Sequence, residues 1–370
     1  MQEIVSLYVR KARHKIMKRI VLTGGGTAGH VTPNIALLGT LLDEDFDIHY
    51  IGSYEGMEKS LIEDEGIPYH GISSGKLRRY FDLKNFTDPF RVIKGFFEAD
   101  KLLKELKADV VFSKGGFVSV PVVMAAKKNH IPAIIHESDM TPGLANKLCF
   151  SSAVKICCNF PETVGKLPGD KAVLTGSPIR AELKSGSAER AKALCSFKED
   201  KPVILSVGGS LGAAGVNKAL REALPKLLKD FNVVHLCGKG KADETLKDTE
   251  GYFQMEYAKD EMKDLFAYCD IIVSRAGANA ICEFLALRKP NLLIPLPASA
   301  SRGDQILNAN SFVKQGFSMM LDEDTMTQED FIGSIYKLYE DRDKYVLNME
   351  KSDQSDAVRT IVNLIKDYAK

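Results

Sequence analysis

Short apolar runs rich in β-branched residues alternate with segments of helical periodicity along most of this chain. The runs predict strands at residues 19–23, 48–52, 109–112, 133–136, 203–207, 233–236, 271–274 and 292–295. Because helical segments lie between successive runs, the alternation indicates parallel sheets covered by helices on both faces. The pattern restarts after Arg180. The sequence therefore predicts an α/β protein made of two tandem, Rossmann-like, doubly wound domains.

The breaks in this pattern set the expected domain boundaries. We expect the first domain at residues 17–180 and the second at 181–350, which agrees with a length of 370 residues. Apolar positions recur at helical spacing near the end of the chain, so residues 351–370 are predicted to form an amphipathic helix that returns to the first domain. Residues 184–200 are charged and weakly periodic, which is typical of a connecting region.

Two features near the start of the chain lead to further expectations. Residues 1–16 precede what reads like a natural start, and we expect an extra segment that is a disordered tail or an upstream leader. The alternative is a short basic arm that touches a membrane. Pro33 is tolerated in the first turn of a helix, so Thr32 is the candidate cap of the helix over 35–42.

Three glycine-rich turns follow predicted strands and carry the first candidate chemistry. They are residues 24–29, the pair Gly115 and Gly116, and residues 208–212. Glycine lets the backbone approach an anion closely, and the next helix offers free N–H groups with partial positive charge. Three such turns in one chain indicate phosphate or sugar contacts in both domains.

The first turn has the glycine spacing of the dinucleotide-binding fingerprint, but the sequence around it does not fit. A dinucleotide-binding domain also needs an acidic residue at the end of the second strand, and this strand ends Tyr50-Ile51-Gly52-Ser53. His30, directly after the turn, is a candidate general base, with local backbone capping as its plain alternative. Glu137 follows the strand over 133–136, where it faces substrate or binds a nearby loop.

Polar residues follow two later strands and are candidates for binding a sugar nucleotide. Asn279 can cap the helix after the turn at 275–278, and Glu283 can accept hydrogen bonds from ribose hydroxyls or stabilise the helix dipole. Asp304 and Gln305 lie in a polar, turn-rich stretch, where they could contact sugar hydroxyls.

Charge and composition exclude several classes of function. A formal net charge of +1 gives no global field for nucleic acid. Seven cysteines without a C-x-x-C pair fit a reduced compartment and packing roles. The acidic stretches at 45–47 and 322–324 lack companion ligands, so we interpret both as solvated charge rather than metal sites. No apolar run reaches the roughly 20 residues of a membrane-spanning helix.

One stretch, residues 75–97, is basic and aromatic together, with a net charge of +4. Cations beside exposed aromatic side chains suit an anionic membrane surface, because peripheral binding needs an apolar anchor and a basic patch together. The alternative is that the aromatic side chains are buried and only the charges are exposed. The expected membrane patch consists of Lys76, Arg78, Arg79, Phe81 and Phe90.

Taken together, the motifs resemble those of the MurG family of N-acetylglucosaminyltransferases. The resemblance runs from about Lys18 to the C-terminus and rests on motifs in the order in which the family carries them. These are residues 25–33, 115–119, 136–137, 143–147, 176–180, 208–213, 275–278 and 304–305. The family has the GT-B architecture, in which two Rossmann-like domains are joined and the C-terminal helix returns to the first.

The resemblance also implies an activity and its substrates. It implies inverting transfer of N-acetylglucosamine from UDP-N-acetylglucosamine to the C4 hydroxyl of undecaprenyl-pyrophosphoryl-N-acetylmuramyl-pentapeptide, a step of peptidoglycan synthesis that bears on cell shape and division. The enzyme would act as a peripheral protein on the cytoplasmic face of the cell membrane. No cofactor or metal is implied, and other cell-wall synthesis proteins are candidate partners.

Roles for individual residues follow from the same resemblance. The first domain's glycine turns, at Gly25, Gly26, Gly115 and Gly116, would bind the acceptor's pyrophosphate, with His30 the preferred base and Glu137 the second choice. In the donor site, Ser210 would contact the diphosphate and Glu283 the ribose, and Arg180, at the end of the first domain, would lie near the nucleotide. The remaining expected substrate-binding residues are Thr27, Ala28, Gly29, Asp139, Ala278, Asn279, Asp304 and Gln305.

Two positions depart from the family pattern, and three rival functions remain open. Asp139 stands where many members carry asparagine, and a carboxylate near a diphosphate would be unfavourable. Phe117 replaces a tyrosine of some members, so no catalytic phenol is expected there. The rivals are a UDP-N-acetylglucosamine 2-epimerase, a diacylglycerol glycosyltransferase and a nucleotide-binding module without chemistry.

Overall fold

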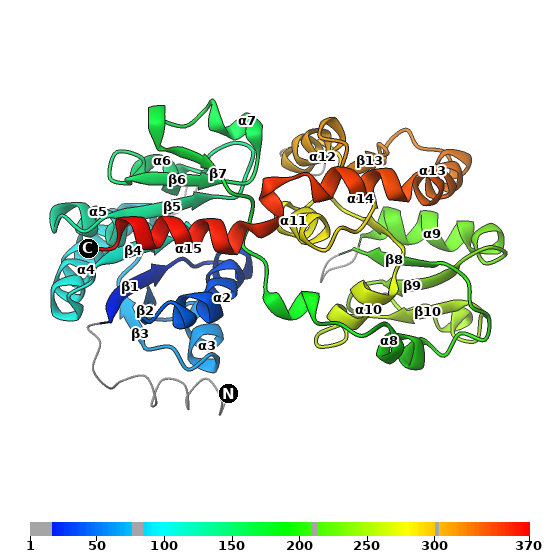
Figure 1. The fold of residues 1–370 in the computed structure, drawn as a ribbon, viewed down its shortest axis with the longest axis horizontal. Helices are drawn as coiled ribbons and strands as arrows, with labels where there is room; N and C mark the ends of the chain where they lie inside the picture. The colour runs from blue at the N-terminus through cyan, green and yellow to red at the C-terminus, as the bar shows by residue number, and fades with distance from the viewer. Residues whose placement is uncertain (1–16, 76–83, 209–212, 300–302) are drawn as a thin grey trace. The chain divides into compact units, whose positions relative to one another are not determined.

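The computed structural model of the protein describes residues 17–75, 84–208, 213–299 and 303–370. Contacts divide the chain into two compact units. The first unit holds the residues up to Arg180 together with Asp356–Lys370, and the second unit holds Ala181–Ser355. Each unit is an α/β layer structure with its own parallel sheet (Figure 1).

The first unit is built on a seven-stranded parallel sheet in the order β3-β2-β1-β4-β5-β6-β7. Its strands are β1 (Lys18–Thr23), β2 (Phe46–Ser53), β3 (Tyr69–Ile72), β4 (Val110–Ser113), β5 (Ala133–Glu137), β6 (Lys155–Cys158) and β7 (Ala172–Leu174). Its helices are α2 (Ala28–Asp43), α3 (Met57–Asp64), α4 (Lys84–Leu106), α5 (Ser119–Lys128), α6 (Leu144–Cys149), α7 (Pro161–Val164) and α15 (Ala357–Tyr368).

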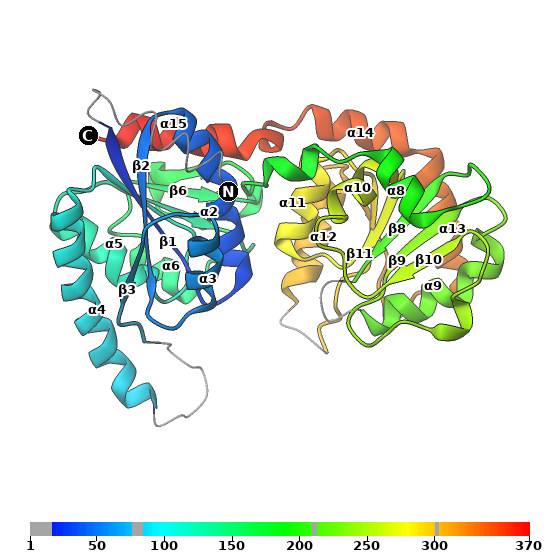
Figure 2. The same ribbon diagram turned by 90° about the horizontal axis from the view of Figure 1, so that it is seen from below.

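Alternate residues of the central strands bury on opposite faces of this sheet. Ile20 and Leu22 of β1 pack into one core with α2 and α15, while Val21 packs into a second core with α4 and α5. A sheet buried on both faces needs apolar residues at nearly every strand position, which explains the continuous apolar runs in the sequence. Figure 2 shows α4 running along α5 on one side of the sheet.

The second unit repeats the plan with a six-stranded parallel sheet in the order β10-β9-β8-β11-β12-β13. Its strands are β8 (Val203–Val207), β9 (Asn232–Leu236), β10 (Tyr252–Met255), β11 (Ile271–Ser274), β12 (Asn291–Leu293) and β13 (Ser318–Met320). Its helices are α8 (Ala188–Cys195), α9 (Ala214–Leu227), α10 (Met262–Tyr268), α11 (Ala278–Ala286), α12 (Asp304–Lys314), α13 (Gln328–Glu340) and α14 (Arg342–Glu350).

Both sheets have the strand order of a doubly wound nucleotide-binding fold, which changes direction next to its first strand. The change lies between β1 and β4 in the first unit and between β8 and β11 in the second. Ligands of such folds bind outside the carboxyl ends of the strands at this switch point. The predicted fold is confirmed, and the glycine turns that follow β1 and β4 lie at the switch point of the first unit.

The C-terminal helix packs on the first unit, as the sequence predicts. Ile361, Val362 and Ile365 of α15 are buried in the core that α2 shares with β1 and β4. Lys18 Nζ donates a hydrogen bond of 2.6 Å to the carbonyl of Ala369, which joins the first strand to the end of the chain. Figure 1 shows α15, in red, lying beside α2.

Several local predictions are wrong. The helix α2 begins at Ala28 with Thr27 as its N-cap, so Thr32 is not a cap and Pro33 lies inside the helix. Pro33 is the sixth residue of α2, so this proline does not mark the first turn of the helix. Residues 184–200 include the helix α8, capped by the Ser187 hydroxyl.

The acidic stretches are solvated charge only in part, because Asp322 and Asp324 are exposed whereas Asp47 and Glu323 are paired; no group of three or more metal-ligating side chains is found among the described residues. Asp47 belongs to β2 and accepts a 2.7 Å hydrogen bond from Arg19. Glu323 pairs with Arg275 at 2.7 Å, and both side chains are largely buried. Their partners lie far away in sequence, so a local reading of charge could not find them. All seven cysteines are free and buried, which agrees with the packing role expected of them.

The packing of α15 generates a stability prediction. Truncating Ile365 to alanine in α15 should lower the free energy of unfolding of the first unit by about 2–5 kcal/mol, because it leaves a cavity in a closed core. The control is Lys366→Ala, which removes a half-exposed ion pair with Glu44 and should cost less than about 1 kcal/mol. Urea unfolding of the two variants measures the difference. Equal losses would mean that α15 is not part of this core.

Candidate functional site

The two glycine turns of the first unit meet at its switch point. A Cβ atom at Gly116 would collide with the carbonyl oxygen of Gly25, so the two backbones are in direct contact. Gly26, Gly115 and Gly116 all have positive φ angles, between 87° and 93°, which L side chains rarely adopt. Lys114 N–H donates to the Thr23 carbonyl at 2.9 Å and extends the β1–β4 ladder into the turns.

His30 lies in the first turns of α2, directly beside the second glycine turn. Its Nδ1 lies 3.1 Å from the carbonyl oxygen of Lys114. A carbonyl only accepts, so Nδ1 carries the proton and Nε2 of the neutral ring carries the lone pair. Burial, with a smaller contribution from the Lys114 charge, lowers the pKa of His30 below its usual value. His30 is therefore neutral at pH 7, with a basic Nε2.

A buried lysine that the sequence analysis did not single out connects these turns to β5. Lys114 is 1% exposed, and its Nζ donates to His136 Nδ1 at 2.7 Å and to Ser138 Oγ at 2.6 Å. His136 Nε2 then donates to the Gly176 carbonyl at 2.9 Å. Burial and the Lys114 charge hold the pKa of His136 well below its usual value. No periodicity marks such a residue, because it stands in a turn.

Glu137 is buried in the structure, whereas Asp139 is exposed. The Glu137 carboxylate is buried and accepts from Asp139 N–H at 2.9 Å, Gly143 N–H at 3.0 Å and Asn146 Nδ2 at 2.9 Å. These contacts organise the loop after β5, which is the plain alternative that the sequence left open for this residue. The Asp139 side chain is exposed at the surface of that loop.

A second buried acid supports the first glycine turn. Glu58 of α3 is 1% exposed and accepts from Gly26 N–H at 3.3 Å, from Ser53 N–H at 3.1 Å and from Ser53 Oγ at 2.5 Å. Its carboxylate lies so close to Gly25 that a side chain there would collide with it. Sequence reasoning did not identify Glu58, since it looks like an ordinary acid in the first turn of a helix.

In the second unit, the predicted donor residues lie on two helices that start near one another. Ala278, Asn279 and Glu283 lie on α11, and Asp304 and Gln305 begin α12. Asn308 of α12 donates to the Ala276 carbonyl at 3.1 Å, and Gln305 Oε1 accepts from Leu296 N–H at 2.9 Å. These contacts bring the two helix N-termini to the same edge of the sheet.

Asn279 does not cap α11 as predicted, because Gly277 is the N-cap and Asn279 lies one position inside the helix. Its Oδ1 is buried and finds no hydrogen-bond partner among the described residues. Arg275 instead fixes the turn before α11, with hydrogen bonds to the carbonyls of Ile294 and Pro295 and to both oxygens of Glu323. The start of α11 is therefore held in place by an ion pair.

Some predicted residues stay outside what the structure describes. Ser210 lies beyond the described ranges, as do Lys76, Arg78, Arg79 and Phe81 of the expected membrane patch, and residues 1–16. Thr27 and Gly26 are exposed at the start of α2, while Gly29 and Arg180 are half-buried. Ala28 is the first residue of α2. Phe90 is described, and its side chain is 74% exposed on α4.

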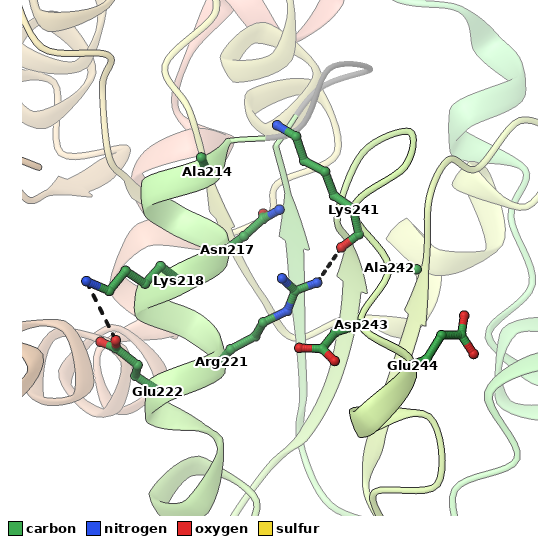
Figure 3. A pocket seen from close by; sticks show the side chains of 9 residues that line it. All are labelled: Ala214, Asn217, Lys218, Arg221, Glu222, Lys241, Ala242, Asp243 and Glu244. Carbon is green, nitrogen blue, oxygen red and sulfur yellow. Dashed lines mark hydrogen bonds and ion pairs between the residues drawn. The ribbon is translucent and has the colours of Figure 1, made fainter.

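The second unit also has a polar pocket of about 560 Å³ that no motif predicts. Figure 3 shows it between α9 and the loop after β9, lined by three cations and three carboxylates. They are Lys218, Arg221, Lys241, Glu222, Asp243 and Glu244. Arg221 donates to the Lys241 carbonyl at 2.5 Å and so closes one wall.

A buried network lies beneath this pocket. His235 Nε2 lies 3.0 Å from Asn217 Oδ1, and His235 Nδ1 lies 2.8 Å from the Tyr252 hydroxyl. Asn217 Nδ2 donates to the Cys237 carbonyl at 2.8 Å, so its Oδ1 faces His235 as an acceptor and the imidazole is protonated at Nε2. Burial, followed by the Arg221 charge, lowers the pKa of His235 to about 3.

Comparison with known proteins shows the family to which the chain belongs. The N-terminal domain model of glycosyltransferase family 28 matches residues 20–157, and its C-terminal domain model matches residues 203–365. The fold and these matches define a glycosyltransferase with two nucleotide-fold domains. The first match spans the sheet of the first unit from β1 into β6, and the second spans all six strands of the second unit.

Similar proteins narrow the family further. The chain is 65% identical over 354 residues, 96% of its length, to the whole UDP-N-acetylglucosamine–N-acetylmuramyl-(pentapeptide) pyrophosphoryl-undecaprenol N-acetylglucosamine transferase of Lachnospira eligens. It is 62% identical to the same-named protein of Lachnoclostridium phytofermentans, over 95% of the chain and 99% of that protein. The solved structure of Acinetobacter baumannii MurG matches 95% of the chain and 99% of its own, with a TM-score of 0.75 and 26% identity. The chain belongs to the MurG family.

The His235 network generates a pH prediction. Its pKa is lower in the folded state than in the unfolded state, so its contribution to stability is complete above about pH 6.5 and is lost as the pH falls toward 3. Between pH 7.5 and 4.5 the wild type should lose about 3 kcal/mol through this residue. His235→Gln keeps a donor and an acceptor but cannot titrate. Urea unfolding at the two pH values should show a smaller loss for the variant, and an equal loss would contradict the assignment.

Proposed function

We propose that this protein transfers N-acetylglucosamine from UDP-N-acetylglucosamine to the C4 hydroxyl of undecaprenyl-pyrophosphoryl-N-acetylmuramyl-pentapeptide, with inversion at the anomeric carbon. The observation that carries the proposal is the 65% identity to a relative named for this transfer, over that relative's whole length. The arrangement of His30 beside two glycine turns supports it, because the site combines a neutral base with backbone groups suited to an anion.

The first unit supplies the acceptor side of the reaction. The turns at Gly25–Gly26 and Gly115–Gly116 bind the acceptor's pyrophosphate through backbone N–H groups, while Thr27, Ala28 and Gly29 at the start of α2 approach the donor. His30 Nε2 takes the proton of the C4 hydroxyl. The oxygen then bonds to the anomeric carbon as the bond from that carbon to UDP breaks. Glu137 shapes the loop after β5, which carries Asp139 toward sugar hydroxyls.

The second unit supplies the donor side. Ser210 contacts the diphosphate and Glu283 of α11 the ribose, while Asp304 and Gln305 at the start of α12 bind sugar hydroxyls. Arg180, which belongs to the first unit and directly precedes the second, contacts the nucleotide. The buried Oδ1 of Asn279 and the backbone at Ala278 line the same helix start. The N-termini of α11 and α12 and of the helix after the Ser210 turn neutralise the departing UDP, so the reaction needs no metal.

A transfer assay with radiolabelled UDP-N-acetylglucosamine and a short-chain lipid I analogue tests the proposal. We expect label in the lipid product, with a β-linked disaccharide, and the same rate after exhaustive treatment with EDTA. An epimerase would convert the nucleotide sugar without any lipid acceptor, and a diacylglycerol glycosyltransferase would label diacylglycerol instead. Either of these products, without labelled lipid I, would overturn the assignment. Loss of the rate in EDTA would overturn only the metal-free mechanism.

The role of His30 generates its own prediction. His30→Ala should lower kcat by roughly 10²–10⁴-fold, since it removes a positioned general base. Binding of UDP should stay close to wild type, because this residue lies in the acceptor unit. The control is His70→Ala, a half-buried histidine on the outer strand β3. Turnover near the wild-type value in the His30 variant would contradict the assignment.

We also propose that α4 carries the membrane contact of the protein. Phe90, Ile93 and Phe97 are exposed to 74%, 55% and 61% and lie at i, i+3 and i+7, on one face of the helix. Lys94 and Lys101 are exposed on the same helix, and Lys128 lies 6.0 Å from the Phe97 ring. No helix among the described residues is long and apolar enough to cross a bilayer. Apolar anchors with nearby cations suit an anionic surface, in keeping with peripheral attachment to the cytoplasmic face of the cell membrane.

Vesicle binding tests this surface. The double variant Phe90→Ser/Phe97→Ser should lower partitioning onto vesicles rich in anionic lipid by at least about tenfold. Each aromatic side chain that enters the bilayer interface contributes about 2 kcal/mol to binding. Leu347→Ser, at a 51% exposed leucine on α14, is the matched control and should bind as the wild type does. Co-sedimentation with vesicles measures both. Unchanged binding of the double variant would show that α4 does not contact the membrane.

The same membrane location would bring other cell-wall synthesis proteins within reach as partners.

A further inference from the structure

The ammonium group of Lys114 is the most deeply buried lysine charge among the described residues of the first unit. The side chain is 1% exposed, although lysine is almost never fully buried without partners. Its Nζ donates to His136 Nδ1 at 2.7 Å and to Ser138 Oγ at 2.6 Å. Removing an ammonium from water costs several kcal/mol, which these acceptors only partly offset. A neutral residue of the same length would fill this space at lower cost, so the charge calls for a reason beyond packing.

The same residue contacts the predicted base through its backbone. The Lys114 carbonyl accepts from His30 Nδ1, while the Lys114 side chain reaches His136 and Ser138 at the end of β5. One residue therefore joins the start of α2, the turn after β4 and the loop after β5. These are the three segments that meet at the switch point of the first unit.

We propose that Lys114 is a positioning residue for the transfer reaction, which fixes the tautomer of His30 through its carbonyl and, through its buried ammonium, keeps His30 unprotonated and the loop after β5 in place. This inference rests on the proposed role of His30 as the base. Lys114 touches neither substrate, because its Nζ is enclosed by protein. It acts on His30 and on the loop that carries Ser138.

Among the charged and titratable groups around His30, Lys114 is the one whose charge acts on the His30 imidazole. His136 on β5 also faces Lys114 and is neutral, since its Nδ1 accepts from Nζ. Glu58 of α3 is turned to Gly26 and Ser53, and Tyr50 of β2 donates to the Gly24 carbonyl. The Glu137 carboxylate is turned to the loop amides after β5. The positive charge of Lys114 acts together with burial to lower the pKa of His30.

Three variants separate charge from packing. Lys114→Met removes the charge and the donor, Lys114→Gln removes the charge but keeps a donor for His136, and Lys114→Arg keeps the charge. NMR titration of the His30 Cε1 proton in the full chain should show a midpoint raised by roughly 0.5–1 pH unit in the first two variants. Lys114→Arg and the control Ser138→Ala, which keeps the ammonium, should titrate as the wild type does.

The pH profile of the transfer reaction provides the second readout. The acidic limb of kcat/KM should move to higher pH by the same amount in Lys114→Met and Lys114→Gln, since protonated His30 cannot act as a base. A folded variant whose His30 midpoint and acidic limb both match the wild type would overturn the inference. A merely structural role would lower the thermal midpoint without moving either one.

The outcomes also distinguish this inference from the proposed function. If the wild-type protein makes no labelled lipid product, the proposed function fails, and the NMR titration still tests the effect of Lys114 on His30. If the wild type is active and the acidic limb moves, both stand. An active wild type with unmoved limbs in both uncharged variants contradicts the role of Lys114 alone.

Discussion

The direct backbone contact between Gly25 and Gly116 is the constraint on which the site depends. Neither glycine tolerates a side chain, because a Cβ at Gly116 would collide with the Gly25 carbonyl and one at Gly25 would collide with Glu58. The contact joins the turn after β1 to the turn after β4 and sets the place where α2 begins. His30, Lys114 and the loop after β5 take their positions from it.

The electrostatics of the two units differ in a way that fits two different tasks. In the first unit, a buried ammonium and a buried carboxylate form hydrogen bonds within the protein. Lys114 donates to His136 and Ser138. Glu58 accepts from Gly26 and Ser53. The first unit thereby presents a neutral imidazole beside backbone amides. In the second unit, the Arg275–Glu323 pair holds the start of α11 rather than a ligand. We propose that fixed dipoles at the helix starts of this unit bind the departing anion in place of a mobile cation.

The sequence predicted what periodicity and glycine can encode. The central strands of both sheets, the turns after β1 and β4 and the amphipathic helix α15 carry strong local signals, and all are present. The strands β3, β6, β7, β10 and β13 were not predicted, because each carries at most one β-branched residue, whereas β4 and β11, of similar length, carry two or three. Proline misplaced the start of α2, since Pro33 lies inside this helix and not in its first turn.

The site could be predicted only in part, for a physical reason. The resemblance to a known family indicated roles for His30, Glu283 and Gln305, and the structure places them in α2, in α11 and at the start of α12. Lys114 and Glu58 were missed because nothing near them in the sequence shows that their charges are buried. Lys114 pairs with His136 and Glu58 with Gly26, each more than 20 residues away. The pairing of Glu323 with Arg275, 48 residues apart, was misread as solvated charge for the same reason.

The most direct test is to measure sugar transfer and UDP binding side by side for Gly116→Ala, with Gly39→Ala as the control in an open position on α2. The substitution separates the two turns without touching the second unit. We predict that Gly116→Ala loses transfer by at least about 100-fold, because reacting groups move by fractions of an ångström, while UDP binds as in the wild type. Transfer near the wild-type rate in the folded variant would contradict the account.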